Sequence, residues 1–151
     1  MIGEMNDIEI ESFLQSETVG RIGCHTGGMT YVVPVTYVFE GGFVYGHSTE
    51  GRKIRMMRRN PEVCFEVDRV NAVNDWRSVI SWGRYEELTG DEGLEAMEML
   101  MKGLVKKPAI RSDHPSYPVR TQDAGRGGHE GISVVVYRIR LAKNRGRYET
   151  P

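Results

Sequence analysis

Hydrophobic and polar residues alternate along several short segments of this chain. A period of two residues is typical of β-strands that bury one face. Glycine-rich turns follow the first two of these segments, and helices do not alternate regularly with strands, so the pattern favours an antiparallel sheet. It predicts six strands, at residues 19–24, 31–39, 43–47, 63–68, 77–88 and 132–141.

A period near 3.6 residues marks three helices. Ile10 and Phe13 lie on the apolar face of a short opening helix, residues 52–59 form a basic helix that ends before Pro61, and an apolar stripe over residues 94–104 marks the third. The predicted fold is therefore mainly β: a six-stranded antiparallel β-barrel, with the sheet closed on itself and a few peripheral helices.

The 151 residues are most simply one domain. Residues 69–75 and 106–131 are predicted loops, and the second is long and rich in proline and glycine. Residues 143–151 are polar and are predicted to form a flexible tail.

Composition narrows the function classes. The chain has 20 Lys+Arg against 21 Asp+Glu residues, so it lacks the overall positive charge of a typical nucleic-acid-binding protein. No apolar run reaches about 18 residues, and the acidic N-terminus lacks the apolar segment of a signal peptide. Cys24 and Cys64 lie inside apolar runs and are predicted to be free thiols. We therefore expect a cytoplasmic protein that neither enters a membrane nor binds nucleic acid.

The turn before the basic helix is the strongest candidate for a ligand site. Ser48 or Thr49 is expected to cap the helix with its hydroxyl, and Gly51 lets a ligand approach the backbone closely. Arg52 and Lys53 then fall in the first helical turn, where positive charge opposes the helix dipole but free N–H groups favour an anion. This combination predicts a phosphate site.

Two alternatives to a phosphate site remain open. The five cations of residues 52–59 are also typical of a solvated basic helix face. They would suit contact with a nucleic-acid backbone as well, although the balanced charge of the whole chain argues against it.

Pro34 and His47 are the next candidates. A proline inside a β-rich segment indicates an edge strand or a bulge, and a bulge leaves backbone groups free to face a ligand. His47 closes a strand at the edge of the predicted site, where it either contacts the ligand or is a satisfied strand-end residue. The histidines and cysteines show no metal-ligand spacing, so no metal site is predicted, and no hydrolase or dithiol motif occurs.

Three sequence blocks together resemble a known family. The first is Val33-Pro34-Val35-Thr36-Tyr37; the second runs from Tyr45-Gly46-His47-Ser48 through Gly51-Arg52-Lys53 and Arg59-Asn60-Pro61 to Val63-Cys64-Phe65; the third joins Trp76-Arg77-Ser78-Val79-Ile80 to Gly83-Arg84-Tyr85-Glu86-Glu87. Their order and spacing resemble the pyridoxamine 5'-phosphate oxidase-like, FMN-binding split-barrel proteins, and among these the branch that includes nitroimidazole-resistance proteins. The resemblance covers residues 5–105 and, by position, the last strand.

The resemblance implies a split β-barrel homodimer with one FMN at each of two sites along the interface. It implies that the strand with Val33, Pro34, Val35 and Thr36 runs beside the flavin ring, and that His47 and Ser48 lie near the ribityl phosphate. It also implies that Arg52 and Lys53 bind the phosphate. Trp76, Ser78 and Val79 of the third block are implied to complete the pocket. No catalytic residue is assigned.

The resulting hypothesis is an FMN-dependent oxidoreductase that passes hydride from a reduced nicotinamide through FMN to a small organic acceptor. The alternatives are a flavin-binding redox module without turnover, and a split barrel that binds haem, through His47, or a deazaflavin. Oxidation of pyridoxamine phosphate would need a second phosphate-binding cluster, for which the long loop offers Arg111, Arg120 and Arg126.

Overall fold

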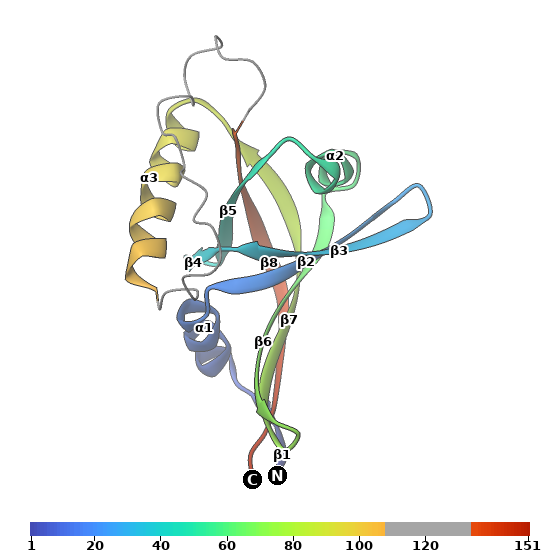
Figure 1. Cartoon of the computed structure of the whole chain (residues 1–151), viewed down its shortest axis with the longest axis vertical. Helices are drawn as coiled ribbons and strands as arrows, with labels where there is room; N and C mark the ends of the chain where they lie inside the picture. The colour runs from blue at the N-terminus through green and yellow to red at the C-terminus, as the bar shows by residue number, and fades with distance from the viewer. Residues whose placement is uncertain (108–133) are drawn as a thin grey trace.

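The structure, a computed structural model, describes residues 1–107 and 134–151. In these residues eight antiparallel strands form one sheet and three helices flank it (Figure 1). The strands are β1 (Ile2–Met5), β2 (Val19–Thr26), β3 (Met29–Thr36), β4 (Val38–Glu40), β5 (Phe43–Thr49), β6 (Glu62–Ala72), β7 (Asp75–Leu88) and β8 (Val134–Glu149). The helices are α1 (Asp7–Ser16), α2 (Arg52–Arg59) and α3 (Gly90–Lys106). The mainly β class is confirmed, but the predicted number of six strands is wrong.

The additional strands are β1 and β4. Tyr37 divides the predicted strand at residues 31–39, because its side chain is fully buried and its backbone amide donates to the carbonyl of Thr18, at 3.1 Å. Its hydroxyl donates to the carbonyl of Leu14 at 2.6 Å. The chain is thus fixed at Tyr37 and resumes as β4. β1 is too short to show a clear alternation, and it forms by pairing with β8.

The sheet is not closed by hydrogen bonds, in contrast to the predicted closed barrel. Its strands follow the order β3-β2-β6-β7-β8-β5-β4, with β1 also paired to β8. β3 is therefore an edge strand, and its register with β2 continues past Pro34 without a shift. The edge-strand alternative for Pro34 is confirmed and the bulge is not found. A proline has no N–H to offer a further strand, which suits it to an edge.

Two predicted irregular segments are strands instead. The supposed tail at residues 143–151 is mostly the end of β8, which pairs with β7 on one side and β1 on the other. The supposed loop at residues 69–75 is mostly the end of the β6–β7 hairpin, where Asn71 donates to Asp75 at 3.1 Å. Both segments are polar because they project beyond the core, not because they lack backbone partners. Of the predicted long loop, only residues 106 and 107 are described, and residue 106 ends α3; residues 108–131 lie outside the described part.

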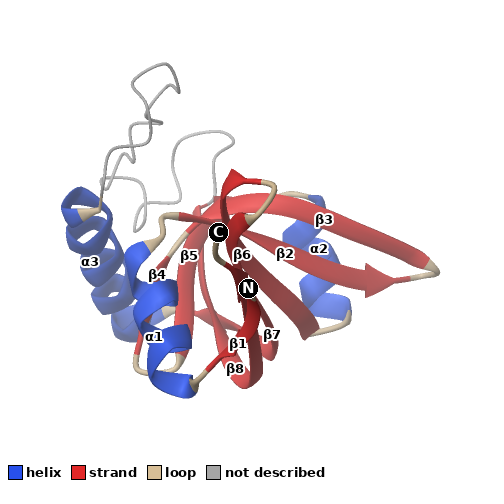
Figure 2. Cartoon of the chain, turned by 90° about the horizontal axis from the view of Figure 1, so that it is seen from below, coloured by secondary structure: helices blue, strands red, loops and turns tan. Residues whose placement is uncertain are grey.

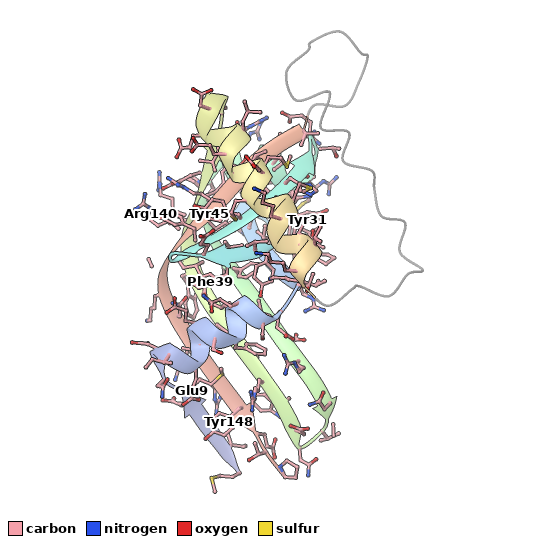
Figure 3. The ribbon with its side chains drawn as sticks, turned by 90° about the vertical axis from the view of Figure 1, so that its left-hand side faces the viewer. Glu9, Tyr31, Phe39, Tyr45, Arg140 and Tyr148 are labelled. Carbon is pink, nitrogen blue, oxygen red and sulfur yellow. The ribbon has the colours of Figure 1, made fainter. Side chains whose placement is uncertain are left out.

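The core has two parts. The larger lies on the inner face of the sheet and includes Ile22, Phe65 and Tyr137, with Phe13 of α1 packed against it. The smaller lies between α3 and the sheet and is centred on Leu100. Figure 2 shows α1 and α3 to the left of the strands and α2 to the right, and buried side chains of α1 and α2 both pack into the larger core. Figure 3, seen from the α3 side, shows α3 crossing over β4 and β5 with α1 below.

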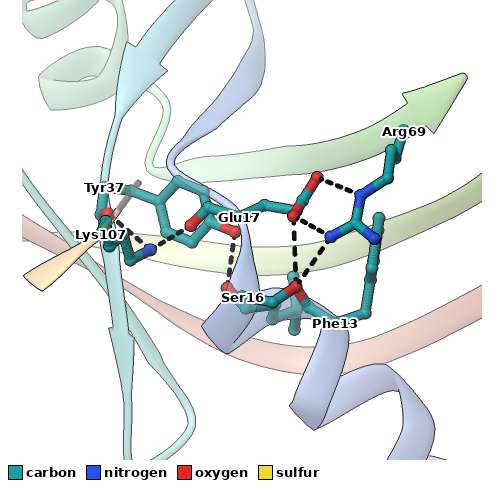
Figure 4. Close-up of polar contacts among 7 residues, drawn as sticks. Phe13, Ser16, Glu17, Tyr37, Arg69 and Lys107 are labelled. Atoms are coloured by element: carbon teal, nitrogen blue, oxygen red, sulfur yellow. Dashed lines mark hydrogen bonds and ion pairs between the residues drawn. The ribbon is translucent and has the colours of Figure 1, made fainter. Parts of the chain in front are cut away.

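A polar cluster joins the end of α1, the break between β3 and β4, strand β6 and the end of α3 (Figure 4). Arg69 forms an ion pair with Glu17 at 2.5 Å. The ammonium of Lys107 donates to the main-chain carbonyls of Glu17 and Tyr37, and it lies 4.1 Å from the centre of the Tyr37 ring. Burial lowers the pKa of Lys107 to about 8, against the opposing effect of the Glu17 charge. We call these residues, Glu17, Tyr37, Arg69 and Lys107, the Glu17 cluster.

Candidate functional site

Within residues 1–107 and 134–151, the backbone N–H groups at the start of α2 have no acceptor. Gly51 is the N-cap residue, and no side chain accepts a hydrogen bond there. The first amide bonded within the helix is that of Arg55, which donates to the carbonyl of Gly51 at 3.1 Å. The amides of Arg52, Lys53 and Ile54 come before this first hydrogen bond and have no acceptor within the helix. They are available to an anion.

The predicted hydroxyl cap is wrong. Ser48 belongs to β5, and its hydroxyl donates to the carbonyl of Thr49 at 2.8 Å rather than accepting from the helix. The helix begins later than a cap at either residue would allow, because Gly51 is extended, with φ −170°, and takes the N-cap position. The absence of a side-chain cap strengthens the case for a ligand here, since no hydroxyl competes for the amides.

Side chains of α2 divide into a buried and a charged set. Ile54, Met56 and Met57 are buried and fix the helix against the protein. Arg58 donates to both carboxylate oxygens of Glu50, at 2.6 and 2.9 Å, and to Glu87 at 3.0 Å. These hydrogen bonds raise the pKa of Arg58. Its charge is therefore balanced within the protein.

The other cations of α2 have no ion pair within the described part of the chain. They are Arg52, Lys53, Arg55 and Arg59. The first turn of α2 also contains no acidic residue. Cations at a helix N-terminus oppose its dipole by about 0.3–1 kcal/mol, so this arrangement has a cost that an anion would remove. The solvated-face alternative explains exposed arginines, but it does not explain the half-buried Lys53.

His47 and Lys53 influence each other. Both are half-buried. Burial lowers the pKa of His47, and the positive charge of Lys53 lowers it further. Burial also lowers the pKa of Lys53. His47 is therefore neutral near pH 7, and a bound anion would favour the charged form of Lys53.

The edge of β3 that no described strand covers contributes backbone groups to the site. The Tyr37 amide bonds to Thr18 on the β2 side, and hydrogen-bonding direction alternates along an antiparallel strand. Backbone groups of Pro34 and Thr36 therefore face the open edge. Val33 and Val35 point their side chains to the core, so any ligand contact from them is limited.

Arg52 links this edge to the helix. Its guanidinium lies 5.9 Å from the centre of the Tyr31 ring and 3.9 Å from the sulfur of Met29, both in β3. Pro34 lies three residues from Tyr31, about 10 Å along the strand. The structure thus brings β3, the end of β5 and the start of α2 to one place, which we call the α2 site.

The third predicted block lies far from the α2 site within one copy of the chain. His47 of β5 and Leu88 of β7 lie level with each other, because both pair with Val136 of β8. Ser78 lies ten residues before Leu88, which is about 33 Å along β7. Trp76 donates to Glu149 at 3.0 Å, near the end of the β6–β7 hairpin. The side chain of Val79 is fully buried. Figure 1 shows this hairpin and α2 at opposite ends of the molecule.

Sequence reasoning missed the outer wall of the site. A groove of about 430 Å³ is lined by Thr26 and by Arg52, Arg55, Met56, Arg58 and Arg59 of α2. The signal was present in the sequence, since arginines at positions 52, 55 and 59 follow helical spacing and share one face. A second cavity, of about 580 Å³, lies between α1 and the ends of β1 and β8 and contains none of the predicted site residues.

The described residues also bear on the metal and membrane predictions. In residues 1–107 and 134–151 no three His, Cys, Asp or Glu side chains gather as they would around a metal ion. None of the helices in that part is both long and apolar enough to cross a bilayer. Cys24 and Cys64 are free thiols, as predicted.

Comparison with known proteins gives consistent relatives. Residues 6–147 match the family described as pyridoxamine 5'-phosphate oxidase. An uncharacterized protein of Rhizobium meliloti (strain 1021) is 29% identical over 126 residues, which are 83% of each chain.

Two crystal structures share the fold. The first is described as a FAD-binding protein from Mesorhizobium loti; it has a TM-score of 0.79 and 28% identity, and the match covers 100% of this chain and 98% of that one. The second is described as a candidate 5-nitroimidazole antibiotic resistance protein from Bacteroides thetaiotaomicron, with a TM-score of 0.70, 24% identity, and coverage of 98% and 87%. The predicted split-barrel resemblance is confirmed.

Proposed function

The chain belongs to the pyridoxamine 5'-phosphate oxidase family, and from this membership we propose that it is a flavoprotein that holds the FMN portion of its cofactor at the α2 site. The observation that carries the proposal is the start of α2, where free amides lie beside two cations without an ion pair in the described part of the chain. The FMN portion is common to FMN and FAD, and a similar structure is that of a protein described as FAD-binding.

The residues present fit such a group. Arg52, Lys53 and the first amides of α2 supply the charge-assisted hydrogen bonds that a phosphate dianion requires. The open edge of β3 at Pro34 and Thr36 offers backbone groups to the polar rim of a flat ring. His47 and Ser48 lie at the end of β5, where a ribityl chain would connect these two parts.

We propose an oxidoreductase activity, with a reduced nicotinamide as donor and a small organic molecule as acceptor. A bound flavin supplies the hydride chemistry. The chain's own residues bind and orient: Lys53 fixes the phosphate, and the open edge of β3 sets the ring. His47 is neutral near pH 7 and serves as a hydrogen-bonding group rather than as a cation.

We also propose that two copies of the chain associate through the outer face of the sheet. Val32, Cys64 and Trp82 lie in one row across this face, with Gly23 between Val32 and Cys64. Val32 is 62% exposed, Trp82 44% and the nearby Ile80 41%, so the face has apolar area to bury. Ser78 and the rest of the third block would then lie near a flavin of the partner copy, so that residues from distant parts of the molecule would form one pocket.

The experiment is a visible absorption spectrum of purified protein after FMN, or in a parallel sample FAD, is added and the free flavin is removed by dialysis. Retained flavin bands, followed by bleaching with a reduced nicotinamide under anaerobic conditions, would support both binding and turnover. Retained flavin without bleaching by any nicotinamide donor would leave the redox-module alternative. Failure to retain FMN or FAD would overturn the proposal, and a haem titration with His47→Ala as control would then test the haem alternative.

A further inference from the structure

The groove on the outer side of α2 carries more positive charge than one phosphate requires. Its wall consists of Thr26, at the end of β2, and of side chains from α2. Met56, only 7% exposed, contributes its apolar part. Four arginines line the groove, and only Arg58 is paired with carboxylates in the described part of the chain.

Arg55 and Arg59 lie away from the start of the helix. Arg55 is one turn beyond Arg52, and Arg59 is about 10 Å along the axis from it, on the same face. The pKa of Glu50 is lowered mainly by Arg58, which donates to both of its carboxylate oxygens. The charge of Arg55 lowers the pKa of Glu50 by a smaller amount. The groove therefore keeps a net positive charge that a phosphate at Arg52 and Lys53 does not reach.

We infer that this groove takes the adenylate half of FAD, with the second phosphate of the cofactor against Arg55 and Arg59. The inference rests on the proposed function, because that function puts the first phosphate at Arg52 and Lys53. A diphosphate that continues from there along α2 meets the next two arginines of the same face. FMN ends at its single phosphate and leaves both arginines without an anion.

The test compares FAD and FMN affinities in the full-length protein freed of flavin. The variants are the double substitution Arg55→Ala/Arg59→Ala and, as a control that removes the same charge, Lys102→Ala/Lys106→Ala on α3, on the other side of the strands from α2 (Figure 2). We expect wild-type protein to bind FAD at least about tenfold more tightly than FMN, since the second phosphate adds charge-assisted hydrogen bonds that FMN lacks. The arginine variant should lose that preference and keep its FMN affinity, and the control should behave as wild type.

Each outcome separates this inference from the proposed function. Equal affinity of the wild type for FAD and FMN would overturn the inference and leave the flavin proposal standing. Equal weakening of FAD and FMN in the arginine variant would also overturn it, because the two arginines would then act on the shared FMN half. Binding of neither flavin would overturn the proposed function itself. Circular dichroism and thermal unfolding would verify that both double variants are folded.

Discussion

The α2 site and the Glu17 cluster both hold half-buried cations, but they treat them differently. In the Glu17 cluster, Arg69 reaches the carboxylate of Glu17 and Lys107 reaches two main-chain carbonyls (Figure 4). In the α2 site, Lys53 is similarly buried and has no ion pair in the part of the chain that the structure describes.

The difference separates structural cations from ligand-binding ones. A buried ammonium is costly unless it is paired, and no carboxylate of residues 1–107 and 134–151 pairs with the half-buried Lys53, which agrees with an anionic ligand as its partner. Free amides at the start of α2 point to the same missing anion. A cluster completed by its own carboxylate and carbonyls, as around Glu17, needs no ligand to explain it.

Lys53→Ala should have the largest effect on binding. We expect flavin affinity to fall about 10- to 100-fold, because a charge-assisted contact with the phosphate is lost. The free energy of unfolding without flavin should change by less than about 0.5 kcal/mol, or rise slightly, since a cation at a helix start is removed. Lys102→Ala, on exposed α3, is the control for lost charge. A large loss of stability without flavin would make Lys53 structural and abolish the contrast with Lys107.

Glu17→Ala should show the opposite profile. We expect the free energy of unfolding to fall by about 1 kcal/mol, because Arg69 loses its carboxylate while remaining 44% exposed to water. Lys107 keeps its contact, since it bonds to the main chain of Glu17. Chemical denaturation measures the change, with the exposed Glu11→Ala of the same helix as control, and flavin affinity should stay as in wild type. Weaker flavin binding in Glu17→Ala alone would show that the two regions are coupled.

A third cluster, formed by Arg21, Glu66 and Asp68, differs from both regions because it contains more negative than positive charge. Arg21 contacts both Glu66 and Asp68, at 3.3 and 3.2 Å. Burial, then the hydrogen bond and charge of Asp68, raise the pKa of Glu66 to about 7 against the opposing effect of Arg21. The folded pKa lies above the unfolded value, so its contribution to stability is complete below about pH 4.5 and is lost as pH rises towards 7.

Glu66→Gln tests this pH dependence. Relative to the variant, wild-type protein should lose about 1 kcal/mol of unfolding free energy between pH 4.5 and pH 7, a value reduced because the side chain is 25% exposed. Thermal unfolding across that range measures it. A wild-type-minus-variant difference that is constant with pH would mean that Glu66 titrates normally in the folded protein.

Ser48→Ala should have the smallest effect on stability. Among the residues that the structure describes, its hydroxyl bonds only to the neighbouring carbonyl, so the expected change is below about 0.5 kcal/mol. A true N-cap would cost about 1 kcal/mol. Thr49→Ala is the parallel substitution, and a loss of about 1 kcal/mol in either would restore the hydroxyl cap that the structure replaces with Gly51.

Local patterns predicted much of this molecule. The buried Ile10 and Phe13 of α1 and the basic helix α2 follow directly from residue spacing. Features that depend on distant partners could not be predicted: the break at Tyr37 rests on Thr18 and Leu14, and the last segment is a strand because β7 and β1 pair with it. Strand register and partners are not encoded in a strand's own alternation.

The site was predicted in the same uneven way. Arg52 and Lys53 were found because helix, turn and charge lie within a few residues of one another. The cap was misplaced because Ser48, Thr49 and Gly51 are all acceptable caps, and only the backbone conformation decides among them. The buried side chain of Val79 and the bond of Trp76 to Glu149 depend on contacts across the sheet, so block order alone could not reveal them.

The most direct measurement compares the affinities of FMN and riboflavin, which differ only by the phosphate. Titration calorimetry of flavin-free protein, Lys53→Met and Lys102→Met would give the phosphate contribution in each. If the cations at the start of α2 hold that phosphate, wild type and Lys102→Met will bind FMN at least about 100-fold more tightly than riboflavin, and Lys53→Met will lose most of this preference. Equal binding of FMN and riboflavin by the wild type would contradict the assignment of the α2 site.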